Sequence, residues 1–300
     1  MKKKAFIEKT ANIILLICAV VAIFAVCVIT LYMFIKGTSA LKEVGVSDLL
    51  FGTIWKPTAS NPSFGIGYII LTSIVGTGAA ILIGVPIGLL TAVFLSEMAG
   101  KRLGTVVGSA VELLAAIPSV IYGLIGMMVL NPIMFKIERM LFAEKSAHQY
   151  TGGANMLSAI IVLAIMILPT VISVSTSSLK AVSDNLRAAS LALGATKEQT
   201  IFWTVIPAAK SGILTGVVLG IGRALGEAMA INMVAGGAVN IPLPFNSVRT
   251  LTTQIVSEMG YASGTHRQVL FTVGLVLYVF IMIVNCVLLK TRKRGFEHGD

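Results

Sequence analysis

Long apolar runs separated by short polar segments dominate this chain. The runs lie at about 12–35, 67–95, 105–130, 156–178, 212–235 and 269–289. A helix needs about 20 apolar residues to cross the hydrocarbon core of a bilayer. The pattern therefore predicts an all-α integral membrane protein with six transmembrane helices.

Prolines interrupt three of these runs, at Pro86, Pro118 and Pro169. A proline inside a helix removes one backbone hydrogen bond and clashes with the preceding turn. We expect kinks at these positions, with neighbouring helices satisfying the freed backbone groups. Pro118 and Pro169 are accordingly candidate hinge or packing residues.

The first run follows four lysines, as the apolar core of a secretory signal would. It is longer than such a core, which holds about 7–15 apolar residues. We therefore read an uncleaved first span. The alternative is cleavage at Thr38–Ala40, whose small residues resemble a weak cleavage site.

Charge is scarce and unevenly placed. The chain is 56% hydrophobic and 12% charged, with a net charge of +10, whereas soluble domains carry about 25% charged residues. Lysine and arginine concentrate in 1–11, 96–104, 179–211 and 290–300, which the positive-inside rule places in the cytoplasm. Both termini are thus predicted inside, and the basic surplus indicates membrane orientation, with the lipid bilayer and not nucleic acid as partner.

Signatures of enzymes and metal sites are absent from the sequence. It has no Gly-x4-Gly-Lys phosphate loop, no Gly-x-Ser-x-Gly elbow and no His-Glu-x-x-His pair. The three cysteines lie in apolar runs, which argues against a disulfide framework, and the three histidines lack metal-ligand spacing. We expect no catalytic residue, no metal and no cofactor in this chain.

The cytoplasmic segment 179–211 carries local structure signals. A helix-forming run, 188–193, ends at Gly194, a natural left-handed stop. Thr196 and Gln199 then form a capping box that starts a second helix, which Pro207 is expected to end. Ordinary helix connections take about 2–8 residues, so this longer corner predicts a docking surface more than a connector.

The fifth run combines glycines with two charges. On an ideal helix of 100° per residue, Arg223 and Glu227 fall on one stripe about 160° wide, together with Gly212, Gly216, Gly220, Gly222 and Gly226. Glycines at four-residue spacing let another helix approach closely. Intramembrane charges cost about 2.5–3.5 kcal/mol each, so this stripe should face protein or water.

Two readings of these charges stay open. Arg223 and Glu227 could form a structural ion pair at four-residue spacing. Alternatively, Arg223 lies on an anion pathway, where its planar guanidinium suits phosphate oxygens and Glu227 orients it. Glu112, about two turns into the third run, is expected to be a helix-packing or gate-hinge residue.

The cytoplasmic corner resembles the coupling loop of ABC importer permeases, Glu-Ala-Ala-x3-Gly-x9-Ile-x-Leu-Pro. Ala189, Gly194 and Pro207 match this pattern, whereas Ala188 replaces its glutamate and Ser190 its second alanine. Further segments resemble phosphate importer permeases of the PstC type, and the resemblance covers about 55–289. These segments are 112–123, 168–170 and 222–230.

This resemblance implies a type I ABC importer permease fold in a bacterial cell membrane. It implies three partners: a homologous PstA-type permease, a dimer of PstB-type subunits that hold ATP and Mg, and an extracytoplasmic PstS-type phosphate-binding protein. The ATPase would dock on Ala189, Ser190, Gly194, Ala195 and Thr196. The segments predicted to be external are 36–66, 131–155 and 236–268. By topology alone, the first and the last of them are candidates for contact with the binding protein.

The resemblance also divides the chain. Residues 1–66 would hold the first span and its external loop, 67–290 the permease domain with its coupling loop at about 188–207, and 291–300 a basic tail. A permease for sulfate or molybdate is the alternative within transport. An ATPase-independent transporter or channel and a membrane sensor are the alternatives from other classes.

Overall fold

The computed structural model of the chain describes residues 2–143 and 148–296. Residues 144–147 of the predicted external segment 131–155, and 297–300 of the predicted basic tail, lie outside the described residues. Within the described part, six helices are long and apolar enough to cross a membrane, which confirms the predicted number. They are Lys9–Leu41, Gly67–Met98, Ser119–Phe142, Met156–Lys180, Lys197–Gly226 and Gly264–Val287.

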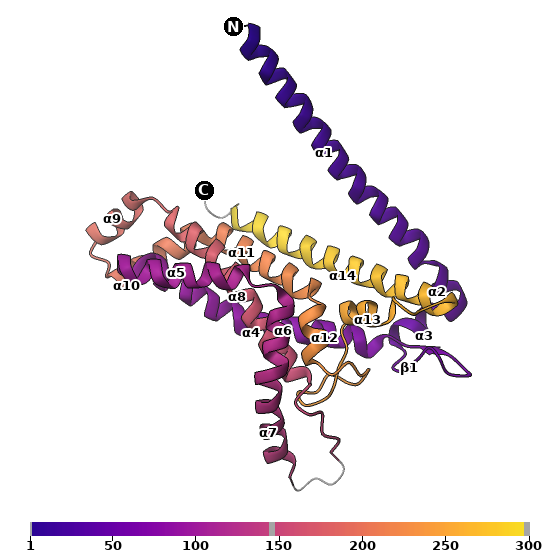
Figure 1. Cartoon of the computed structure of the whole chain (residues 1–300). Helices are drawn as coiled ribbons and strands as arrows, with labels where there is room; N and C mark the ends of the chain where they lie inside the picture. Colours follow the sequence, from indigo (N-terminus) through magenta and orange to yellow (C-terminus); the bar gives the residue numbers. More distant parts are fainter. Residues whose placement is uncertain (1, 144–147, 297–300) are drawn as a thin grey trace.

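The N-terminal helix leads into a region that holds two short helices and the only two strands among the described residues. The helices are α1 (Lys2–Gly37), α2 (Ser39–Val44) and α3 (Val46–Phe51). Strand β1 (Trp55–Lys56) pairs antiparallel with β2 (Ser63–Phe64), with Trp55 opposite Phe64. Figure 1 places this region at one end of the bundle and α9 and α10 at the other.

The remaining helices follow in chain order. They are α4 (Gly67–Val93), α5 (Lys101–Ala116), α6 (Ser119–Ile125), α7 (Asn131–Phe142), α8 (Met156–Lys180), α9 (Asp184–Ala192), α10 (Lys197–Thr200), α11 (Ile206–Gly226), α12 (Met229–Val234), α13 (Leu251–Glu258) and α14 (Gly264–Phe296). Three π-helical segments join some of them: η1 (Phe94–Met98), η2 (Gly126–Leu130) and η3 (Ile201–Val205).

Helix α8 is the centre of the bundle, packed between α4 and α11. The predicted glycine stripe of α11 forms the contact between α11 and α8. A Cβ on Gly212, Gly216 and Gly220 would meet Ser178, Val174 and Val171 of α8, respectively. On the other side, a Cβ on Gly84 would lie 2.6 Å from Ile167. Small residues at both contacts let three helices approach closely.

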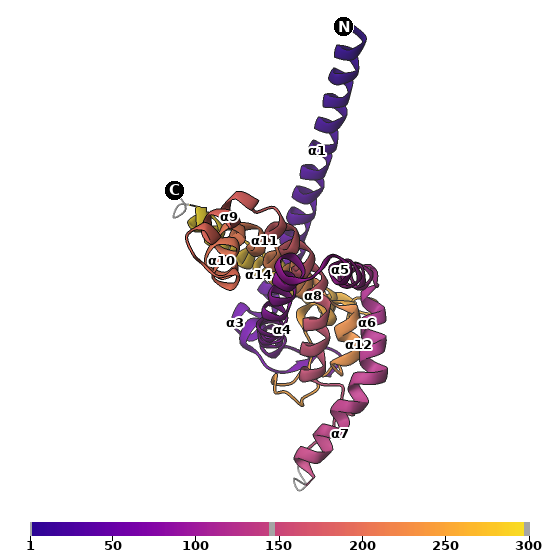
Figure 2. The ribbon, with the colours of Figure 1, turned by 90° about the vertical axis from the view of Figure 1, so that its left-hand side faces the viewer.

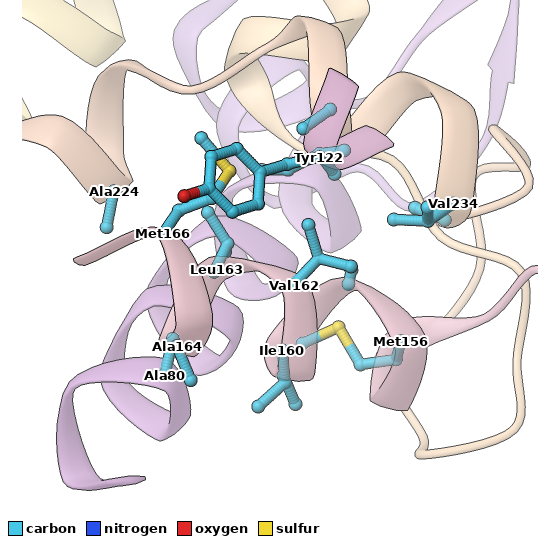
Figure 3. Close-up of a cluster of buried hydrophobic side chains, with 14 of the residues drawn as sticks. Ala80, Tyr122, Met156, Ile160, Val162, Leu163, Ala164, Met166, Ala224 and Val234 are labelled. Carbon is cyan, nitrogen blue, oxygen red and sulfur yellow. The ribbon is translucent and has the colours of Figure 1, made fainter. Parts of the chain in front are cut away.

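The largest buried cluster surrounds α8. Figure 3 shows the Tyr122 ring of α6 lying over Met166 and Leu163 of α8, with its hydroxyl on the side of Ala224. Val234 of α12 belongs to the same cluster. The core therefore joins α6, α8, the end of α11 and α12, the elements that carry the candidate site.

The third run differs from its prediction. It does not form one helix over 105–130: Ile117 and Pro118 are extended, with ψ of 126° and 142°. Proline disfavours helical conformation in the residue before it, so α5 ends there. A new helix, α6–η2–α7, then leads away from the bundle (Figures 1 and 2) and reaches Phe142, well into the segment predicted to be an external loop.

The fifth run also differs from its prediction. Pro207 does not end a helix, because α10, η3 and α11 are continuous and Pro207 lies in the first turn of α11. The π-helical segment before Pro207 replaces the backbone hydrogen bonds of an α-helix by bonds five residues apart. In the first turn of α11, the backbone N–H that a proline lacks would have no partner within the helix. At the far end the helix stops at Gly226, so the expected run 212–235 is two helices, α11 and α12.

Helix α1 packs on α14 near its C-terminal end, where the hydroxyls of Thr30 and Tyr278 lie 2.9 Å apart and Tyr32 meets Phe271 edge to face. Figures 1 and 2 show it projecting from the external end, and none of its most apolar window is buried in this chain. In contrast, 61% of the corresponding window of α8 is buried. Pro86 and Pro169 lie inside α4 and α8, as the sequence pattern predicted.

Candidate functional site

Arg223 lies in the last turn of α11, half-buried and within electrostatic range of the Tyr122 hydroxyl. No described protein group accepts a hydrogen bond from its guanidinium or forms an ion pair with it. The space beside it is open, since a Cβ on Gly222 or Gly226 would meet nothing within 4 Å. A cation with free donors next to open space is suited to hold an anion.

Glu227 does not pair with Arg223 among the described residues, so the structural ion pair, one of the two readings left open by the sequence, is not formed. The helix has ended, and Glu227 has extended backbone with φ −74° and ψ 122°. Its Oε1 accepts a hydrogen bond of 2.9 Å from the Ala230 backbone N–H, while its carbonyl accepts one of 2.8 Å from Thr252. The buried carboxylate therefore caps α12 and leaves Arg223 unneutralised.

Tyr122 connects the two helices that meet at the break at Pro118. Its hydroxyl donates a 2.8 Å hydrogen bond to the Leu114 carbonyl, which lies on the far side of the break. The next residue, Gly123, packs on α12: a Cβ there would lie 2.8 Å from the Ala230 Cα. From the sequence, Tyr122 was singled out only as part of a segment that resembles phosphate importer permeases. A tyrosine and a glycine one turn after Pro118 were a usable signal.

The residues predicted to pack helices or to act as hinges lie in different surroundings. Glu112 is exposed on α5, away from the buried cluster. Pro169 is buried inside α8. Gly212, Gly216 and Gly220 pack against α8, whereas Gly226 faces open space, so the stripe divides into a packing part and an open part.

A buried polar network on the external side was missed by the sequence analysis. Glu258 of α13, 4% exposed, accepts hydrogen bonds from Trp55 at 3.1 Å and contacts His266 at 2.7 Å. Arg249 forms an ion pair with the same carboxylate and donates to the Gly237 carbonyl at 2.7 Å. One carboxylate thus joins the β1–β2 hairpin, α13, α14 and the loop after α12. These segments are too far apart in sequence for a local sequence pattern to predict that they meet.

The cytoplasmic corner has the predicted form. Gly194 has φ of 88°, the left-handed stop after α9. The Thr196 and Gln199 capping box is complete, with bonds of 2.8 and 3.2 Å. Two large apolar side chains next to the corner are almost fully exposed: Leu193 is 90% exposed and Trp203 82%.

Ser190, which replaces an alanine of the coupling-loop pattern, ties the two halves of the corner together. Its hydroxyl lies 3.0 Å from that of Thr200 and 3.4 Å from that of Thr204. Ala189 is exposed on α9, and Ala195 and Thr196 lie beyond Gly194. Of the residues predicted to meet an ATPase, Ala189, Gly194 and Thr196 are exposed, whereas Ser190 and Ala195 are half-buried.

Comparison with known proteins identifies relatives over nearly the whole chain. The family model described as binding-protein-dependent transport system inner membrane component matches residues 84–292. The chain is 37% identical to the probable ABC transporter permease protein YqgH of Bacillus subtilis (strain 168), over 96% of this chain and 92% of that protein. It is 34% identical to the phosphate transport system permease protein PstC of Xylella fastidiosa (strain Temecula1), over 94% of this chain and 91% of that protein.

The fold has solved counterparts. The chain is similar to one in the crystal structure of the bacterial alginate ABC transporter in complex with alginate pentasaccharide-bound periplasmic protein. The TM-score is 0.64 at 17% identity, covering 93% of this chain and 94% of the other. This likeness and the family match confirm the predicted fold class. The domain bounds at 66/67 and 290/291 stay predictions.

Proposed function

The chain belongs to the family of binding-protein-dependent transport system inner membrane components, and from this premise we propose that it is the permease subunit of an ATP-driven phosphate importer. Relatives of more than 30% identity named as phosphate transport permeases support the substrate. The observation that carries the proposal is Arg223, a cation without a protein partner among the described residues, set beside open space at the end of α11.

Arg223 would hold the anion for part of its passage. Its planar fork of N–H donors matches the spacing of phosphate oxygens. Glu227 has its carboxylate turned to the α12 backbone, so it leaves the guanidinium charge available. One unpaired arginine, without a closed cage of donors, binds an anion weakly enough for release, which conduction requires.

ATP would act from outside this chain. A partner ATPase subunit would hold ATP and Mg and dock on the corner formed by Ala189, Ser190, Gly194, Ala195 and Thr196. Its closure would move the corner and switch the bundle between inward and outward access, a rigid-body transition. A second permease of the PstA type would complete the pathway, and a PstS-type binding protein would deliver phosphate at the external end.

The test is uptake by the assembled importer in proteoliposomes, with ATP inside and phosphate or sulfate outside. We expect phosphate to accumulate only with hydrolysable ATP, and sulfate to enter far more slowly. Uptake of sulfate in preference to phosphate would reassign the substrate to another oxyanion. Uptake without ATP would overturn the importer class, and an intact assembly that moves neither anion would overturn anion transport.

A further inference from the structure

Arg187 of α9 joins three elements at the cytoplasmic end of the bundle. Its guanidinium donates two hydrogen bonds to Glu97 near the end of η1, from Nη2 to Oε1 at 2.8 Å and from Nε to Oε2 at 3.3 Å. It also donates to the carbonyls of Leu179, the penultimate residue of α8, at 2.9 Å and of Val182 just beyond it. A last bond of 3.2 Å reaches Asp184, in its own helix.

These five bonds use all five N–H donors that an arginine has. The Glu97 side chain is 8% exposed and that of Arg187 20%, so both charges are largely removed from water. Bonds to this carboxylate raise the pKa of the Arg187 guanidinium further above its usual value. Arg187 is therefore permanently charged and has no donor left for a partner protein.

The bonds of Arg187 lie next to the corner on which a partner ATPase would push. Helix α9 carries the exposed corner, and Arg187 fixes it to the cytoplasmic ends of both α4 and α8. Ser190 fixes the same helix to η3 and hence to α11. Helices α4, α8 and α11 pack through small residues, so such cross-links make the corner and the three helices one rigid unit.

We propose that the Arg187–Glu97 pair is the strut through which the coupling helix α9 moves α4 and α8 together. This inference rests on the proposed function, because it takes an ATPase to push on α9. Arg187 and Glu97 are positioning residues: neither is needed to bind substrate, and their loss would let α9 move without the transmembrane helices. ATP hydrolysis would then continue with less transport.

The first test compares Glu97→Gln with Asp184→Asn in the assembled importer. Both remove one carboxylate that faces Arg187, but Asp184 is 99% exposed and lies within α9, so its loss leaves the link between elements intact. We expect Glu97→Gln to lower uptake per ATP hydrolysed by about tenfold, a size typical of coupling between sites, and Asp184→Asn to leave this ratio unchanged. An unchanged ratio in Glu97→Gln would overturn the proposal.

The second test does not depend on which substrate is carried. Spin labels at the exposed residues Leu90 of α4 and Asn185 of α9, in a chain whose three cysteines are replaced, report the distance between the two helices. We expect one distance in the ATP-free and ATP-trapped states of the parent chain, and a change between those states in Glu97→Gln. A distance that already changes in the parent chain would overturn the strut.

The two proposals fail differently. If the parent importer moves no phosphate, the proposed substrate is wrong, yet the label distance still decides the strut. If Glu97→Gln does not assemble, Arg187→Lys replaces it, because lysine keeps the charge and loses the planar fork. A purely structural pair would lower assembly in these variants and leave both the uptake ratio and the label distance unchanged.

Discussion

Arg223 is the residue on which the transport proposal depends most directly. We expect Arg223→Ala to lower ATP-dependent phosphate uptake by about 10- to 100-fold, because a hydrogen bond to a charged group contributes about 1.5–3 kcal/mol. Arg223→Lys should fall between this variant and the parent, since it keeps the charge without the fork. Uptake is measured at equal membrane abundance, with Lys210→Ala, exposed at the other end of α11, as the control. Normal uptake by both Arg223 variants would remove the residue from the pathway.

Glu227 gives a second prediction at this scale, on stability. Glu227→Ala leaves the Ala230 N–H without its acceptor, and an unsatisfied buried donor costs about 1–3 kcal/mol. Glu227→Gln keeps an oxygen in place, so it should unfold close to the parent. Thermal unfolding in detergent measures both variants. Equal losses would mean that the charge matters more than the cap.

Arg223 and Glu227 also show which parts of the candidate site the sequence could predict. A lone arginine inside an apolar run was enough to single out Arg223, because charge in such a run is costly. The partner was inferred from four-residue spacing, which holds only while the helix continues. The helix ends at Gly226, and its end depends on packing of α12 against α6, which no local pattern records.

At the scale of elements, the glycines of α11 divide into packed and open positions, and this provides a matched pair. Gly212→Ala adds a methyl group against Ser178 of α8, whereas Gly222→Ala adds one into open space. Both variants gain the same helix propensity, about 1 kcal/mol. The difference between their free energies of unfolding therefore reports packing. We expect Gly222→Ala to be neutral or stabilising and Gly212→Ala to lose about 1–3 kcal/mol by overpacking.

The same thermal unfolding assay distinguishes the two, with the parent chain as reference. If Gly212→Ala is as stable as Gly222→Ala, then α8 and α11 are not in the close contact described. Uptake should be recorded alongside, because Gly222 lies next to Arg223. A change in uptake without a change in stability would concern the pathway and not the packing.

Element boundaries were predictable where the cause is local. Gly194 and the Thr196–Gln199 box determine the corner by backbone conformation and capping alone, and both are as expected. The prolines were less reliable guides. Pro118 separates two helices, whereas Pro207 continues one, because a π-helical segment precedes the second and not the first. That difference arises from how each segment packs.

For the whole molecule, apolar runs and charge bias were sufficient to predict six membrane helices and an α fold. They could not predict the external network, because its members come from four separate segments between Trp55 and His266. In the sequence alone, Trp55 looks like an aromatic residue at the membrane interface, and the other members look like polar or charged residues in loops. Only the fold brings them to one buried carboxylate.

That carboxylate leads to a prediction for the whole external end. Glu258→Ala would remove the ionic partner of Arg249, whose side chain is only 18% exposed, and would free Trp55 and His266. Breaking a buried ion pair costs about 3–5 kcal/mol. The control is Glu43→Ala, whose exposed bond to Thr265 of α14 should contribute within about 0.5 kcal/mol. Hydrogen exchange should rise in the β1–β2 hairpin and in the loop after α12 together, because both are held by Glu258. Faster exchange in only one of them would mean that Glu258 does not hold the two segments together.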